Sequence, residues 1–226
     1  MVGTKKPFIL VTGTACSGTR FIHFVFRAAK IPMKHESGKL STGLSSWHCG
    51  AVDGNIYYTR KYDGTLYRIP DERAHTCEDI PKENGIVILH QTRHPLKTIS
   101  TCQRLMQISW EYIYRVTKWK INSKQPLLLR CMLYWHLWNQ MIEKRADYQY
   151  RIENIYNEWD NICNVINRPE FSLRLDKIKR IDKSNTKINH SRPNMYKPRT
   201  WRDLRKQDAQ LTKKIIEQGR KYGYDI

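Results

Sequence analysis

Close to the N-terminus the sequence reads Phe8-Ile9-Leu10-Val11-Thr12-Gly13-Thr14-Ala15-Cys16-Ser17-Gly18-Thr19-Arg20. The first five of these residues are apolar or β-branched and stop at a glycine, which is typical of a central parallel strand buried on both faces. After Gly18, apolar residues recur at helical spacing as far as Lys30. The pattern predicts a strand, a loop bounded by glycines and a helix in succession.

A second unit of the same kind follows further along the chain. The run Gly85-Ile86-Val87-Ile88-Leu89-His90 leads into Arg93-His94-Pro95, and a helix is predicted from Leu96 to about Ile108. Another short strand is predicted over 148–152, and further helices over 127–145, 155–166 and about 203–222. Strands that alternate with helices indicate an α/β fold, here a P-loop-like domain with a central, mainly parallel sheet flanked by helices.

Length and composition limit the class of protein. The 226 residues (27.0 kDa) suit one domain over 1–226, with a small hairpin or insertion at about 53–70 and a mobile basic loop at about 182–203. The 40% hydrophobic content argues against collagen-like, low-complexity and wholly disordered chains. The net charge of +19 favours anionic partners, such as a nucleotide, nucleic acid, a lipid surface or an acidic glycan.

No run approaches the roughly 18 apolar residues that span a bilayer, and the N-terminus lacks the apolar region of a secretory signal. We therefore expect a cytoplasmic protein. The six cysteines are widely spaced and form no C-x-x-C pair, which argues against a zinc ribbon. Reduced and mostly buried thiols are expected instead.

The loop between the first strand and helix is a candidate anion site. Backbone N–H groups and the helix dipole at such a junction can hold a phosphate or its sulfur analogue. The G-x-x-x-x-G spacing matches a nucleotide triphosphate loop, but Thr19-Arg20 stands where such a loop has Lys and then Ser or Thr. The position of the magnesium ligand is thus disrupted. The alternative is that the loop is a tight turn whose role is only to let the strand and the helix pack together.

The second junction supplies further anion-binding groups. Arg93 offers the fork geometry that phosphate prefers, and Ser100 and Thr101 add hydroxyls in the following helix. Loops at the carboxyl ends of neighbouring parallel strands converge on one crevice, so both junctions can serve one ligand. The alternative is that Arg93 caps a strand end and Pro95 opens the helix.

The two junctions together resemble a known family. Gly13 to Thr19 is similar to the phosphosulfate loop, and Arg93, Pro95 and Ser100 or Thr101 are similar to the 3′-phosphate motif, of sulfotransferases that use 3′-phosphoadenosine 5′-phosphosulfate (PAPS). The resemblance to small bacterial and phage-type members extends over Lys34-His35-Glu36, Ser45-Ser46-Trp47, 89–97, 150–153 and 200–204.

The resemblance implies a set of residues that bind PAPS, with no metal. These are Gly13, Thr14, Ala15, Cys16, Ser17, Gly18, Thr19, Arg20, Arg93, Ser100, Thr101 and Arg192. A late basic loop at about 189–199 is expected to cover the nucleotide. The chain departs from the family at Cys16, where Lys or Arg commonly contacts the oxygen that bridges phosphate and sulfate. Arg20 is the nearest cationic substitute, with Lys97 or Arg192 as alternatives.

The acceptor needs a base within hydrogen-bond reach of its proton. The resemblance points to His35 and Glu36, which follow a strand predicted at 31–33, and it favours Glu36 as the base. A surface glutamate beside a packing histidine is the alternative. The two residues are adjacent, so no H-E-x-x-H metal helix is implied.

Several functions remain open beside sulfuryl transfer to a hydroxyl or amine. A P-loop kinase would need the magnesium ligand that Thr19-Arg20 replaces, and a nucleic-acid-binding protein has no matching signature in the sequence. A sulfotransferase-like protein that binds PAPS without catalysis is a third reading, because of Cys16. The basic surface favours an acidic glycan or acidic peptide as acceptor.

The aromatic side chains of Tyr134, Trp135 and Trp138 are expected in the core.

Overall fold

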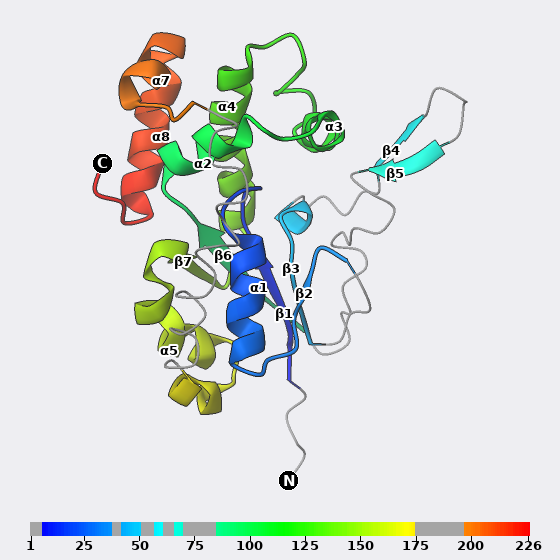
Figure 1. Cartoon of the computed structure of the whole chain (residues 1–226), viewed down its shortest axis with the longest axis vertical. Helices are drawn as coiled ribbons and strands as arrows, with labels where there is room; N and C mark the ends of the chain where they lie inside the picture. Colours follow the sequence, from blue (N-terminus) through cyan, green and yellow to red (C-terminus); the bar gives the residue numbers. More distant parts are fainter. Residues whose placement is uncertain (1–5, 38–41, 51–56, 61–65, 70–84, 175–196) are drawn as a thin grey trace.

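The computed structural model describes residues 6–37, 42–50, 57–60, 66–69, 85–174 and 197–226. Its elements, shown in Figure 1, are β1 (Phe8–Thr12), α1 (Thr19–Ala28), β2 (Lys34–His35), β3 (Gly43–Ser45), η1 (His48–Gly50), β4 (Tyr57–Arg60), β5 (Leu66–Ile69), β6 (Ile86–Thr92), α2 (Pro95–Cys102), α3 (Gln107–Val116), α4 (Leu127–Glu143), β7 (Tyr148–Arg151), η3 (Ile152–Asn154), α5 (Ile155–Val165), η4 (Pro169–Arg174), α7 (Trp201–Gln207) and α8 (Ala209–Lys221).

The central sheet has five parallel strands in the order β2-β3-β1-β6-β7. The predicted α/β fold with a parallel sheet flanked by helices is therefore confirmed. Strand β1 lies in the middle, and Thr12 at its end pairs in register with His90 of β6. Because the two strands are parallel neighbours, the loops that follow them start side by side.

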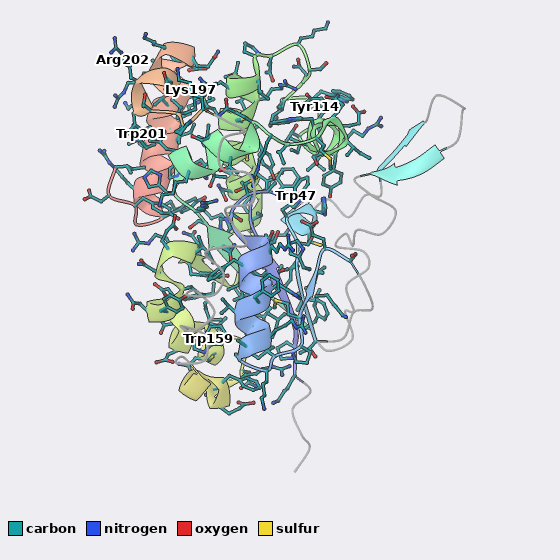
Figure 2. The ribbon with its side chains drawn as sticks, in the orientation of Figure 1. Trp47, Tyr114, Trp159, Lys197, Trp201 and Arg202 are labelled. Atoms are coloured by element: carbon teal, nitrogen blue, oxygen red, sulfur yellow. The ribbon has the colours of Figure 1, made fainter. Side chains whose placement is uncertain are left out.

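Helices cover both faces of this sheet. On one face, Val11 and Leu89 pack with α1 and α5, where the rings of Phe26 and Trp159 meet edge to face at 5.3 Å. Figure 2 shows Trp159 reaching toward α1 from α5. On the other face, His90 of β6 is hydrogen-bonded to Asn139 of α4. Helices α2, α3, α4 and α8 form a second core there, and it contains the fully buried Tyr134, Trp135 and Trp138, as predicted.

Some element boundaries differ from the sequence prediction. The helix predicted over 96–108 is two helices, α2 and α3, because Met106 adopts an extended backbone (φ −67°, ψ 157°) between them. The closing helix is also two, since Asp208 is extended and accepts a hydrogen bond from the Leu211 N–H at the start of α8. The strand predicted at 31–33 begins at Lys34 instead. Antiparallel β4 and β5 confirm the hairpin, although its turn at Asp63-Gly64 lies outside the described residues.

Five of the six cysteines lie in the described part of the chain, and all five are free thiols. Four of them are buried, in agreement with the prediction, whereas Cys16 is half-buried.

None of the described helices has the length and apolar character needed to cross a membrane.

Buried His90 makes the stability of the fold depend on pH. Burial lowers its pKa from 6.5 to about 4, so the unfolded chain binds the proton more readily. The contribution of His90 to the free energy of unfolding is therefore complete above about pH 6.5. It is lost as the pH drops toward 4, and the loss is about 3 kcal/mol. Urea unfolding at pH 7 and pH 4.5 should show a smaller loss in His90→Gln than in the wild type. An equal loss in both proteins would contradict this assignment.

Candidate functional site

The loop between β1 and α1 has a shape that its glycines permit. A Cβ at Gly13 would lie 2.3 Å from the carbonyl oxygen of Gln91, so only glycine fits against β6. Gly18 begins α1 with φ 101°, and Cys16 also has a positive φ of 69°. The Ser17 N–H closes the turn by donating to the Thr14 carbonyl at 3.1 Å.

Side chains from other elements fix this loop from beneath. The Ala15 N–H donates to the hydroxyl of Tyr134 in α4 at 2.7 Å, and the Gln91 amide donates to the Ser17 carbonyl at 2.9 Å. Gln91 is in turn held by the Tyr150 hydroxyl of β7, which donates to its side-chain oxygen at 2.8 Å. All of these groups are buried. The loop is thus preorganised by the sheet and by α4.

Loss of the Tyr134 hydroxyl should destabilise the protein. In Tyr134→Phe the buried Ala15 N–H loses its acceptor, and an unsatisfied buried donor costs about 1–3 kcal/mol. The partly exposed Tyr148 also makes one hydroxyl hydrogen bond, to Glu158, so Tyr148→Phe is a matched control with a smaller expected effect. Urea denaturation of both variants measures the difference. Equal stabilities would show that Tyr134 does not hold the loop.

Two buried hydroxyls at the loop have no hydrogen-bond partner in the described part of the chain. They belong to Thr12 at the end of β1 and to Ser17, whose side chain lies over Gly13. Both residues are at most 1% exposed. An unsatisfied buried hydroxyl costs free energy, so each has unused capacity for an oxygen of a ligand. Ser17 precedes Gly18, the N-cap of α1, and the helix dipole also favours negative charge at this end of the helix.

Arg93 brings the two sequence motifs into contact. Its guanidinium Nη1 donates to the carbonyl oxygen of Cys16 at 2.9 Å, and the side chain is half-buried. The predicted convergence of the two junctions is therefore present in the fold. A guanidinium has five N–H donors, so Arg93 keeps capacity for an anion while it holds the loop.

Helix α2 carries the two predicted hydroxyls, and they differ in availability. The Ser100 hydroxyl accepts a hydrogen bond from the Arg199 N–H at 2.8 Å and keeps its own proton for another acceptor. The Thr101 hydroxyl donates to the Lys97 carbonyl within the helix at 2.7 Å. Both residues are 4% exposed. Of the pair, Ser100 is the one whose hydroxyl donates to no acceptor in the described part of the chain.

The segment that leads into α7 docks on this helix. The Arg199 guanidinium donates to the side-chain oxygen of Gln103, and the Gln103 amide lies 3.4 Å from the Lys197 carbonyl. Figure 2 shows Lys197 and Trp201 at this end of the molecule, above α2. Part of the predicted basic loop thus lies beside the second junction. Arg192 and the rest of 189–196 lie outside the described residues.

The surroundings of Cys16 supply the positive charge that the cysteine lacks. The neighbouring Cys102 thiol lowers the pKa of Cys16, and the guanidinium groups of Arg104 and Arg93 lower it further against the effect of burial. The charges of two arginines are therefore felt at Cys16, where the family commonly has Lys or Arg. Arg20 is exposed on the first turn of α1, and its charge contributes to the lowered pKa of His35.

The candidate bases lie on the other side of the loop. The His35 Nε2 is 3.4 Å from the Thr19 hydroxyl and 3.7 Å from a carboxylate oxygen of Glu36. Burial, with the charges of His23 and Arg20, lowers the pKa of His35 to about 4. The imidazole is thus neutral at neutral pH, and the contact with Glu36 is not an ion pair there. The Glu36 N–H donates to the Ser45 carbonyl at 3.0 Å, which fixes its backbone at φ 59°.

Several residues of the site were not predicted from the sequence. Gln91 and Tyr134 hold the loop, Arg104 faces Cys16, and Glu153 accepts hydrogen bonds from the His94 N–H and the Tyr224 hydroxyl. Of these residues, only Gln91 could have been noticed in the sequence, because a polar side chain within a buried strand requires a hydrogen-bond partner. The others come from distant parts of the chain.

No group of three or more histidine, cysteine or acidic side chains that could hold a metal ion occurs among the residues that the structure describes. Comparisons of the chain with protein-family models, with curated proteins and with solved structures found no match. The chemistry of the site therefore rests on the residues themselves.

Proposed function

We propose that the protein is a PAPS-dependent sulfotransferase. The observation that carries this proposal is the hydrogen bond from Arg93 to the Cys16 carbonyl, which joins two anion-binding junctions in one site. A nucleotide with phosphate groups at both its 5′ and 3′ positions could place one phosphate at each of these two junctions. The sequence resemblance to sulfotransferases supports the same ligand.

The described residues can be assigned to the two ends of this nucleotide. The 5′-phosphosulfate would occupy the loop, where Ser17 offers an unpartnered hydroxyl and the helix dipole of α1 favours an anion. The 3′-phosphate would lie between Arg93 and the hydroxyl of Ser100. PAPS, when bound, supplies the sulfuryl group that is transferred.

Positive charge at the reacting group would come from arginines. Charge develops on the oxygen between phosphate and sulfate as the bond breaks, and preorganised cations stabilise it. Cys16 cannot do this, but the Arg104 and Arg93 guanidinium groups act on the same point. We assign this role to Arg104, because Arg93 is already assigned to the 3′-phosphate.

A base is needed to take the proton of the acceptor. We assign this role to Glu36, whose carboxylate is one third exposed beside Thr19 and His35. His35 stays neutral and orients the carboxylate. The acceptor is a hydroxyl or amine, and the net charge of +19 favours one on an acidic glycan or acidic peptide.

A second candidate function is PAPS binding without catalysis, which the thiol at position 16 favours. The two functions are separated by incubating the protein with PAPS and a panel of sulfated glycans, acidic peptides and simple phenols. Formation of sulfated acceptor with an equal amount of adenosine 3′,5′-bisphosphate is the expected result. A protein that binds the bisphosphate tightly yet releases none from PAPS with any acceptor would support the non-catalytic alternative.

A further inference from the structure

Two thiols meet where the loop contacts α2. Cys102 is the last residue of α2 and is fully buried, and its sulfur lies 3.4 Å from the carbonyl oxygen of Ala15. Cys16 is the next residue of the loop and packs against the same apolar cluster. The pair therefore connects the first junction directly to the helix that follows the second.

The pKa values of the two thiols are shifted in opposite directions. The neighbouring Cys102 thiol and the charges of Arg104 and Arg93 lower the pKa of Cys16, which favours its thiolate. Burial, together with the neighbouring Cys16, raises the pKa of Cys102 well above its usual range. The thiolate is the reactive form of cysteine, so Cys16 is suited to act as a nucleophile while Cys102 holds its proton.

The other described cysteines lack this combination. Burial raises the pKa of Cys131 to about 12 and that of Cys163 to about 11, and Cys49 is buried in a separate cluster. Cys16 is also the one described cysteine that is not fully enclosed. Of the described cysteines, Cys16 is therefore the one with which a solvent-borne oxidant would react first.

We propose that Cys16 and Cys102 form a peroxide-sensitive thiol pair, which closes to a disulfide and ties the anion-binding loop to α2. The Cys16 thiolate attacks one oxygen of hydrogen peroxide, the O–O bond breaks, and hydroxide leaves and is protonated to water. Cys102 then loses its proton and attacks the Cys16 sulfenic acid, and the S–O bond breaks to release a second water. Two thiols and one peroxide thus give one disulfide and two waters, and a dithiol reverses the change.

The disulfide should weaken anion binding at the loop. Bond formation draws the Cys16 sulfur toward α2 and removes the Cys102 proton from the Ala15 carbonyl. It thereby shifts the backbone of the loop that is proposed to bind the anion. This consequence rests on the proposed function, whereas formation of the disulfide does not.

The test is peptide mapping by mass spectrometry after graded hydrogen peroxide. We expect a linked pair of peptides that contain Cys16 and Cys102, lost on treatment with dithiothreitol. Cys102→Ser should stop at a sulfenic acid on Cys16 that dimedone traps, and Cys131→Ser should still form the linked pair. Links that involve other cysteines, or no reaction at Cys16 in the wild type, would overturn the proposal without reliance on any variant.

Titration with adenosine 3′,5′-bisphosphate tests the consequence separately. The oxidised wild type should bind at least about tenfold more weakly than the reduced protein, and oxidised Cys102→Ala should not show this loss. Equal affinity of the oxidised and reduced wild type would overturn the regulatory role. If the reduced protein does not bind the bisphosphate at all, the proposed function fails, and the disulfide map still decides the thiol pair.

Discussion

Arg93→Ala should bind adenosine 3′,5′-bisphosphate about 30-fold to several thousand-fold more weakly than the wild type. The substitution removes a charge-assisted phosphate contact worth about 2–5 kcal/mol when buried. It also removes the hydrogen bond to the Cys16 carbonyl, which aligns the loop with the second junction. Both effects act in the same direction, and isothermal titration calorimetry measures their sum.

Lys6→Ala is the matched control for this loss. It removes one positive charge as well, but Lys6 precedes β1 and pairs with Glu170, at the end of the strand opposite to the loop. Its affinity should stay within about twofold of the wild type, because exposed charges more than a Debye length away are largely screened. Unchanged affinity in Arg93→Ala, or an equal loss in both variants, would contradict a specific phosphate site at Arg93.

Glu36→Gln should lower turnover by about 100-fold or more and leave the affinity for the bisphosphate unchanged. The amide keeps the size of the side chain but cannot take the acceptor's proton, and a positioned base contributes typically 100-fold or more. Turnover is measured as bisphosphate released from PAPS with a saturating acceptor. Glu170→Gln is the control and should turn over normally, because Glu170 pairs with Lys6 before the start of β1, at the end of the strand opposite to the loop.

The two candidate bases can also be distinguished by pH. His35 is already neutral above about pH 4, so a histidine base would leave turnover flat between pH 5 and 8 in Glu36→Gln at close to the wild-type rate. We expect instead a low rate across that range. Normal turnover in Glu36→Gln would move the role to His35 or to another group.

The sequence allowed prediction of those parts of the fold whose signals are local. The apolar runs at 8–12 and 85–90 match β1 and β6, the periodic segment after the first run matches α1, and the helix predicted over 127–145 matches α4. Strand β3 has only three residues, Gly43–Ser45, and it is defined by pairing with β1. Such a short element has no periodic pattern of its own, so the sequence could not predict it.

The same division holds at the site. The loop glycines, Arg93 and Ser100 were predicted, since each stands at a strand-to-helix junction with a recognisable spacing. Tyr134 and Arg104 were not, because their roles depend on tertiary contacts: Tyr134 is 119 residues from Ala15 in sequence. The break after α2 brings Arg104 back toward Cys16, and nothing in the helical pattern of 96–108 predicted that break.

The most direct measurement of the central claim is calorimetric titration of the reduced protein with adenosine 3′,5′-bisphosphate and with ATP, each with and without magnesium. One site built from both junctions predicts tight binding of the bisphosphate, independent of magnesium, and much weaker binding of ATP. Absence of bisphosphate binding, or a preference for ATP that requires magnesium, would contradict it and favour a P-loop kinase or a nucleic-acid-binding protein.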